Sequence, residues 1–136
     1  MPEETSQQLR SEQQRAAHAW KKIDDIQNDT GIDQKQYGSL VRGLPAMLQS
    51  NGLGQTLAFL KAKAKGDLRS VHMILYNHLA EWVGKCVNSQ GDLLGWVITQ
   101  RSDTYRRATT EAITYALWLR RFAEAQGWGD TQGDSR

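Results

Sequence analysis

The chain has 136 residues, of which 39% are hydrophobic and five are tryptophan, so it can bury one core and is not an intrinsically disordered protein. Its net charge of +2 and its pI of 8.8 fall short of the strongly basic composition of a DNA-binding domain. A single cysteine excludes an intramolecular disulfide, and no apolar run approaches the ~20 residues that span a bilayer, so we expect a cytoplasmic protein without a membrane segment.

The charge is unevenly distributed along the chain. Residues 1–33 carry four Lys or Arg against seven Asp or Glu, a net charge of −3. Residues 35–121 carry twelve Lys or Arg against five Asp or Glu, a net charge of +7. The middle of the chain is therefore where a weak contact with a polyanion would form.

Apolar residues at helical spacing recur along the whole chain and predict an all-α protein. The first helix is expected over about residues 3–29. Its apolar face consists of Leu9, Ala16, Trp20 and Ile23. Thr30-Gly31 then ends the helix, since glycine commonly follows the last helical turn.

A second helix follows and ends at Asn51-Gly52. Its apolar face consists of Tyr37, Leu40, Val41, Leu44 and Leu48. Pro45 lies within this face and should bend or break the helix, because its ring clashes with the carbonyl four residues back. Gly38 and Gly43 weaken the helix by about 1 kcal/mol each relative to alanine.

Two further helices are predicted before a loop at residues 88–92. The apolar face of the first consists of Leu53, Leu57, Leu60 and Ala64. The second begins after Asp67, which can cap it. Its apolar face consists of Leu68, Val71, Leu75, Leu79, Trp82 and Cys86. On such a face Cys86 would be an inert core residue.

The chain closes with a short helical piece over residues 93–99, capped by Asp92 and anchored by Trp96, and a long helix. Ser102 or Asp103 opens the long helix, and Gly127 ends it. Its core side consists of Tyr105, Ala108, Ala112, Tyr115, Leu119 and Phe122. We therefore predict one domain over residues 1–128, an all-α bundle of about six helices, and a disordered tail over residues 129–136.

Residues 51–66, NGLGQTLAFLKAKAKG, pose the main functional question. Their glycines suggest a nucleotide-binding loop, but such a loop follows a strand, so close turning between helices is favoured. Lys61 and Lys65 share one helix face, and Arg69 could extend that basic patch, whereas Lys63 points nearly opposite. The alternative is that these lysines stay solvated near a helix C-terminus, whose dipole they complement.

The last helix carries further candidates for contact with RNA, namely Arg106, Arg107 and Arg121. Trp118 is interleaved with them and either stacks on a base or packs against a neighbouring subunit. Apolar residues beside Trp118 favour subunit packing. The arginines also have an intrahelical alternative, the ion pairs Arg107–Glu111 and Arg121–Glu124.

Catalytic chemistry has little support in the sequence. The three histidines, His18, His72 and His78, are too far apart or on different faces, and no metal-binding spacing is present. Asp24, Asp25 and Asp29 cluster near a helix end and could bind a cation or a basic neighbour, although a solvated acidic patch is favoured. We expect no enzymatic activity, metal or cofactor; a small hydrolase using these residues is the alternative.

Three blocks resemble the signature blocks of a known family: SEQQRAAHAWKKI (11–23), YGSLVRGLPAMLQSNGLGQTLAFLKAKAKG (37–66) and YRRATTEAITYALWLRRFAEA (105–125). The matching features include Arg15-Ala16, Leu44-Pro45, Asn51-Gly52-Leu53, Gln55-Thr56-Leu57-Ala58-Phe59, Tyr105-Arg106, Thr110-Glu111-Ala112 and residues 118–125. On these residues the chain resembles the small α-helical subunit of Cmr, the type III-B CRISPR effector complex. The likeness is diffuse over residues 67–100.

The resemblance implies a non-catalytic protein of antiviral defence. In that family several copies stack head to tail beside the crRNA–target duplex, so the implied partners are other Cmr subunits, further copies of the chain and RNA backbone. Lys61 and Lys65 would then lie toward the RNA. The alternative is a purely structural spacer whose basic residues meet Asp24 and Asp25 of the next copy. The motif residues Asn51, Gln55 and Thr56 are expected to be internal caps that shape a turn.

Overall fold

The computed structural model describes residues 2–129, with side chains from Arg10 onward, and contains five helices there. They are α1 (Pro2–Gln27), α2 (Gln34–Ala64), α3 (Val71–Val87), α4 (Leu93–Val97) and α5 (Ser102–Gln126). This part of the chain has no β-strand, so the predicted all-α fold is confirmed. None of its helices combines the length and apolar character needed to cross a membrane.

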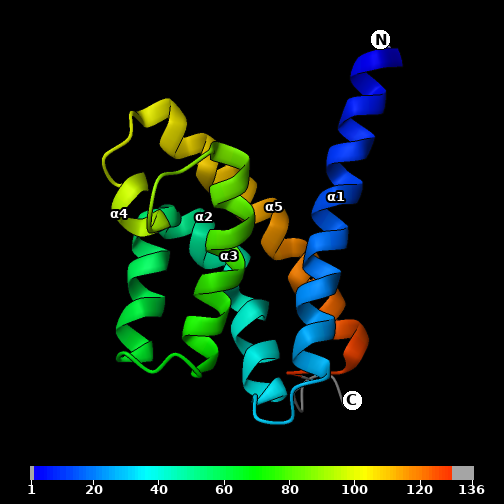
Figure 1. Cartoon of the computed structure of the whole chain (residues 1–136), viewed down its shortest axis with the longest axis vertical. Coiled ribbons are helices and arrows are strands. Elements are labelled where there is room, and N and C mark those ends of the chain that lie inside the picture. The colour runs from blue at the N-terminus through cyan, green and yellow to red at the C-terminus, as the bar shows by residue number, and fades with distance from the viewer. Residues whose placement is uncertain (1, 130–136) are drawn as a thin grey trace.

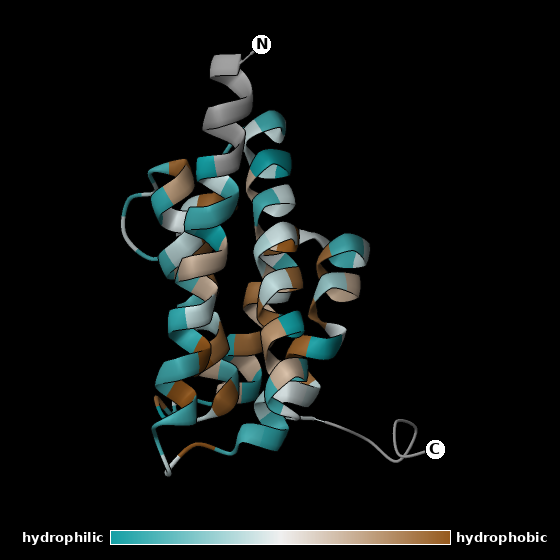
Figure 2. Cartoon of the chain, turned by 90° about the vertical axis from the view of Figure 1, so that its right-hand side faces the viewer, coloured by the Kyte–Doolittle hydropathy of each residue, from teal (hydrophilic) through white to brown (hydrophobic). Residues whose placement is uncertain are grey.

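Helix α5 lies at the centre of the packing. It runs diagonally across the molecule and packs against α1, α2 and α3 (Figure 1). Ala108, Ala112, Tyr115 and Leu119 are fully buried along it, as their spacing predicted. The alanines let neighbouring helices approach closely, while Tyr115 and Leu119 fill the space between them. Figure 2 shows apolar residues gathered between the helices and hydrophilic residues on the outward faces.

Helix α2 consists of two segments that meet at Gly52. Gly52 has φ 82° and ψ 170°, and it is the residue of α2 with non-helical torsions. In Figure 1 the first segment rises from the bottom of the bundle, and the second descends toward the lower left. Counting these segments separately gives the six helices that the sequence predicted. The end predicted for the second helix at Asn51-Gly52 is confirmed, because a positive φ suits glycine. The break predicted at Pro45 was wrong, since α2 keeps helical torsions there.

The apolar faces predicted for both segments of α2 are confirmed. Leu44 and Leu48 of the first segment and Leu57 and Leu60 of the second are completely buried. Burying each such side chain contributes roughly 1.5–3 kcal/mol relative to leaving it in water. Two separate stretches of helical spacing therefore bury their apolar faces in one common core.

Three residues assigned to apolar helix faces are exposed, two of them within helices. Trp20 is 45% exposed, because α1 turns Ala19, Ile23 and Ile26 toward the core and Trp20 lies about 100° around the helix from Ala19. Cys86 is also exposed, so its assignment to the core was wrong.

The assignments around the start of α3 also need correction. Leu68 is 73% exposed because it lies in the connection that precedes the helix. Ser70 caps α3, since its side chain accepts a hydrogen bond from the amide of Met73 at 3.1 Å. Asp67, which the sequence suggested as the cap, instead accepts a hydrogen bond from the amide of Arg69.

The chain after α5 turns back toward the beginning of α2. Trp128 is 6% exposed, and the backbone at Trp128 and Gly129 lies directly against Gly38. The rest of the tail predicted over residues 129–136 lies outside the described residues. Gly38 therefore has a packing role, because it leaves room for another stretch of backbone.

Candidate functional site

Lys61, the first of the predicted RNA contacts, is engaged within the fold. Its Nζ lies 2.9 Å from Oδ2 of Asp92 and 5.1 Å from the ring centroid of Tyr76. The Tyr76 hydroxyl donates to Asp92 at 2.7 Å and accepts from the amide of Leu94 at 3.2 Å. Partial burial raises the pKa of Asp92, but the hydrogen bonds from Tyr76 and Lys61 outweigh it and hold that pKa below its ordinary value. Lys61 thus helps to position the start of α4.

The other two residues of the predicted basic patch differ in their surroundings. Lys65 is exposed at the C-terminal end of α2, in the left-handed conformation with φ 52°. The guanidinium of Arg69 lies 3.1 Å from Asp29 and links the α2–α3 connection to the α1–α2 connection. Only Lys65 of the three therefore presents its charge to solvent without a carboxylate partner among the described residues.

The arginines of α5 also divide into paired and unpaired groups. Arg121 lies 3.9 Å from Glu124, so the predicted Arg121–Glu124 pair is confirmed. The predicted Arg107–Glu111 pair is wrong, because Glu111 bonds to Arg15 of α1 instead. Arg106 and Arg107 are exposed and form no ion pair within residues 10–129.

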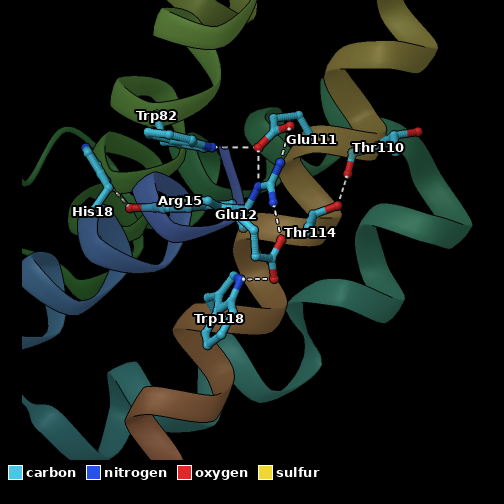
Figure 3. A network of polar contacts seen from close by, with 9 residues as sticks. Glu12, Arg15, His18, Trp82, Thr110, Glu111, Thr114 and Trp118 are labelled. Carbon is cyan, nitrogen blue, oxygen red and sulfur yellow. Dashed lines mark hydrogen bonds and ion pairs between the residues drawn. The ribbon is translucent and has the colours of Figure 1, made fainter. Parts of the chain in front are cut away.

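A polar network joins α1, α3 and α5 (Figure 3). The Arg15 guanidinium donates from Nε to Glu111 at 2.6 Å and from its second terminal nitrogen at 3.2 Å. The indole of Trp82 donates to the same carboxylate at 2.7 Å. Arg15 also donates to Glu12 at 2.6 Å, and Glu12 accepts from the indole of Trp118 at 3.2 Å. The network pairs charged groups of α1 and α5 and adds an indole donor from α3.

Arg15 and Glu111 lie largely out of the solvent. Their side chains are 14% and 19% exposed. The hydrogen bonds that Arg15 donates to Glu111 are the main cause that raises the pKa of Arg15, against the opposing effect of burial. Because both residues belong to the blocks on which the family resemblance rests, those blocks meet in space through a two-point ion pair.

A second contact joins the other matching blocks. The amide of Gly54 donates to the hydroxyl of Tyr105 at 2.7 Å, and the amide of Leu53 donates to Oγ1 of Thr109 at 3.2 Å. The hydroxyl of Thr56 donates to the carbonyl of Gly52 at 2.8 Å. The prediction that Thr56 shapes a turn is confirmed. Asn51 and Gln55 are exposed, and their predicted capping role stays a prediction.

Trp118 lies beside an open groove between α1 and α5. The groove has a volume of about 400 Å³ and is lined by Glu12, Thr114, Leu117, Trp118 and Arg121. Trp118 is half-buried and packs on Phe122, with ring centroids 5.3 Å apart. Leu117 is 41% exposed. The predicted role of Trp118 in a subunit interface stays a prediction.

The candidate acidic residues and histidines form separate local contacts within residues 10–129. Asp24 accepts from Asn28, and Asp25 from Lys21, each at 3.4 Å on the surface. Nδ1 of His18 shares a hydrogen bond of 2.6 Å with the Tyr115 hydroxyl. Over the same residues, no three His, Cys, Asp or Glu side chains lie close enough together to hold a metal ion.

We expect His78 to make the stability of the fold depend on pH. It is 8% exposed and shares a hydrogen bond of 2.8 Å with the Tyr37 hydroxyl. Burial lowers its pKa from 6.5 to about 3, and nearby Lys22 acts in the same direction while Glu81 opposes it. Between these two values the unfolded chain binds more protons than the folded one. Stability is therefore complete above pH 6.5 and decreases on acidification, by at most about 1.4 kcal/mol per pH unit from this residue.

Urea denaturation between pH 7 and pH 4.5 measures this effect. We expect the variant His78→Gln, whose amide can still bond to Tyr37, to lose the part of the slope of unfolding free energy against pH that His78 supplies. His18, whose pKa burial also lowers, keeps its own part of the slope. The partly exposed His72 provides the control, and His72→Gln should retain most of the wild-type slope. An unchanged slope in His78→Gln would contradict the assignment.

The fold and these contacts define a small all-helical protein whose polar clusters hold its helices to one another. The family described as CRISPR-associated protein (Cas_Cmr5) matches residues 11–126, and the chain belongs to this family. A curated relative from Thermus thermophilus, named CRISPR system Cmr subunit Cmr5, is 28% identical over 110 residues, which cover 81% of this chain and 90% of the relative. The resemblance to the small helical subunit of the type III-B Cmr complex is confirmed.

Proposed function

We propose that the chain is a non-catalytic subunit of the type III-B Cmr effector complex in CRISPR defence, stacked in several copies along the crRNA–target RNA path. The family match and the name of the Thermus thermophilus relative support membership of the complex. The observation that carries the non-catalytic role is the pairing of Arg15 with Glu111. This pair uses one charged residue from each of two matching blocks to join α1 to α5, so a cytoplasmic scaffold fits the pair better than an enzyme does.

The basic residues without a carboxylate partner are the best candidates for contact with RNA, because their charge is free to meet phosphate. Arg106 and Arg107 stand side by side near the beginning of α5, and both are exposed. Arginine suits phosphate, because its planar guanidinium can form two parallel hydrogen bonds. Lys61, Arg69 and Arg121 are weaker candidates, since each lies beside a carboxylate. A few contacts per copy, repeated along a stack, would bind RNA through multivalency.

Reversing the charge of Arg106 and Arg107 tests this assignment. We expect an effector reconstituted with the double variant Arg106→Glu, Arg107→Glu to bind target RNA more weakly. Each RNA phosphate that the variant no longer neutralises should reduce the slope of log affinity against log salt concentration by about 0.7–0.9. The measurement is the affinity for target RNA over a series of salt concentrations.

The matched control is the double variant Lys21→Glu, Lys35→Glu. It changes the net charge by the same amount at two exposed positions on α1 and α2. It should leave the affinity and the salt slope close to those of the wild type. Equal behaviour of the two double variants would contradict direct RNA contact by α5.

The second candidate function is a structural spacer that does not contact RNA. It is favoured by Asp24 and Asp25, which are exposed and make only long hydrogen bonds within the chain. Basic residues of one copy would then meet these acidic residues of the next. Under this function the α5 double variant would weaken self-association and leave the affinity of the assembled effector for RNA unchanged.

A further inference from the structure

The seam between α1 and α5 exposes an unusual group of apolar side chains. Trp20 and Leu117 are 45% and 41% exposed, and the rings of Trp20 and Trp118 flank Phe122 at centroid distances of 5.1 and 5.3 Å. The groove lined by Leu117 and Trp118 opens beside them. Contiguous exposed aromatic and aliphatic groups of this kind mark surfaces that bind another protein.

A second exposed apolar group lies in the connection between α2 and α3. Leu68 is 73% exposed at its tip. The tip is held by hydrogen bonds from the amide of Asp67 to the carbonyl of Ala64 at 2.9 Å and from the amide of Ser70 to the carbonyl of Asp67 at 3.2 Å. Arg69 ties it further to Asp29. Leu68 is therefore presented by an ordered turn, which reduces the entropic cost of binding.

The groove and the tip lie in different regions of the molecule. In Figure 1 the connection between α2 and α3 is at the lower left, whereas α1 lies on the right. A contact between the tip of one copy and the groove of another is therefore heterologous, since it joins two unlike surfaces. Such contacts leave a free tip at one end and a free groove at the other, so they add copies in a row.

We propose that the Leu68 side chain of one copy inserts between Leu117 and Trp118 of the next copy, with Asp67 facing Arg121. This contact rests on the proposed stacking and names the surfaces that would form it. The charges support it, because Asp67 is an exposed acid beside the apolar tip and Arg121 is a base at the groove. The Arg121 side chain is accessible to a partner, because it is 74% exposed and lies 3.9 Å from Glu124, near the upper limit for an ion pair. RNA is a poor occupant of the groove, because the Glu12 carboxylate that lines it would repel phosphate.

Disulfide trapping in the assembled effector tests the contact. All variants carry Cys86→Ala, which removes the native cysteine. An equimolar mixture of Leu68→Cys and Leu117→Cys chains is assembled and mildly oxidised. We expect disulfide-linked dimers of the two variants, because the inserted tip would bring the two Cα atoms to the roughly 4.4–6.8 Å that a disulfide spans.

A matched control replaces Leu68→Cys with Ala62→Cys, an exposed position on the preceding helix. This mixture should cross-link roughly tenfold more slowly, as expected without the raised local concentration of a bound tip. Equal rates for the two mixtures would overturn the proposal. So would dimers formed by Leu117→Cys alone, which indicate a symmetric contact, or cross-links from Leu117→Cys to a different subunit.

A charge exchange provides an independent test that leaves the apolar groups in place. Asp67→Arg and Arg121→Asp should each weaken self-association, and the double variant should restore it. The contact is overturned if the double variant does not restore self-association and the disulfide does not form, although the effector still contains several copies of the chain. That result leaves the proposed function standing. Absence of the chain from the effector would overturn both.

Discussion

Replacing Glu111 by alanine should lower the free energy of unfolding by about 3 kcal/mol, which is the largest loss we expect from a polar substitution. The substitution removes the carboxylate that accepts two hydrogen bonds from the Arg15 guanidinium. The Arg15 side chain is only 14% exposed, so water cannot fully replace that carboxylate. It also leaves the indole N–H of Trp82 without its acceptor. Urea denaturation at pH 7 measures the loss.

The control is Glu124→Ala on the same helix. It breaks the exposed pair with Arg121, which spans 3.9 Å, so the loss should be below about 1 kcal/mol. Glu111→Gln separates the two parts of the network, because it removes the charge and keeps one acceptor oxygen. It should fall between the wild type and Glu111→Ala. A loss for Glu111→Ala no larger than that for Glu124→Ala would contradict a stabilising role for the network.

Replacing Gly38 by alanine should destabilise the protein by about 2 kcal/mol or more, although alanine favours a helix. A Cβ at Gly38 would lie 2.5 Å from the carbonyl carbon of Trp128, 2.6 Å from its oxygen and 2.7 Å from the amide nitrogen of Gly129. These are backbone atoms, so the chain after α5 would have to move away. The measurement is again chemical denaturation, with protease sensitivity after α5 as a second readout.

Gly43 is the matched control five residues further along α2. It is exposed, and a Cβ there meets no atom within 4 Å. Gly43→Ala should therefore stabilise the protein by up to about 1 kcal/mol, through the lower conformational entropy of the unfolded chain. The two substitutions are expected to change stability in opposite directions. Stabilisation by both would show that the chain near Trp128 does not pack on Gly38.

Helical spacing predicted the elements well where an apolar face is continuous. The two segments of α2 repeat leucines at intervals of three and four, and Leu44, Leu48, Leu57 and Leu60 are all buried. Helical spacing predicted the buried face wrongly where a small and a large apolar residue are adjacent in the sequence. Ala19 and Trp20 are both compatible with the pattern of α1, and the smaller residue is the one that faces the core. Hydrophobicity alone does not encode that choice.

The polar contacts were less accessible to sequence analysis, because they join residues far apart along the chain. Arg15 and Glu111 are separated by 96 positions, and Gly54 and Tyr105 by 51. A local ion pair between Arg107 and Glu111 fitted the helix equally well. One indication of these contacts was present in the sequence: all four bonded residues fall within the blocks that match the family. Lys61 was likewise predicted to be an exposed cation, because its partner Asp92 lies 31 residues away in the sequence.

The central place of α5 has a consequence for biosynthesis. Helices α1, α2 and α3 all pack on α5, and of these described helices α5 leaves the ribosome last. Until Tyr115 and Leu119 emerge, α2 and α3 can pack on each other, but the apolar faces that the earlier helices turn toward α5 stay uncovered, so nascent chains are exposed to aggregation. We expect chains arrested before residue 102 to require a chaperone, whereas release of the full chain permits rapid folding of the whole domain.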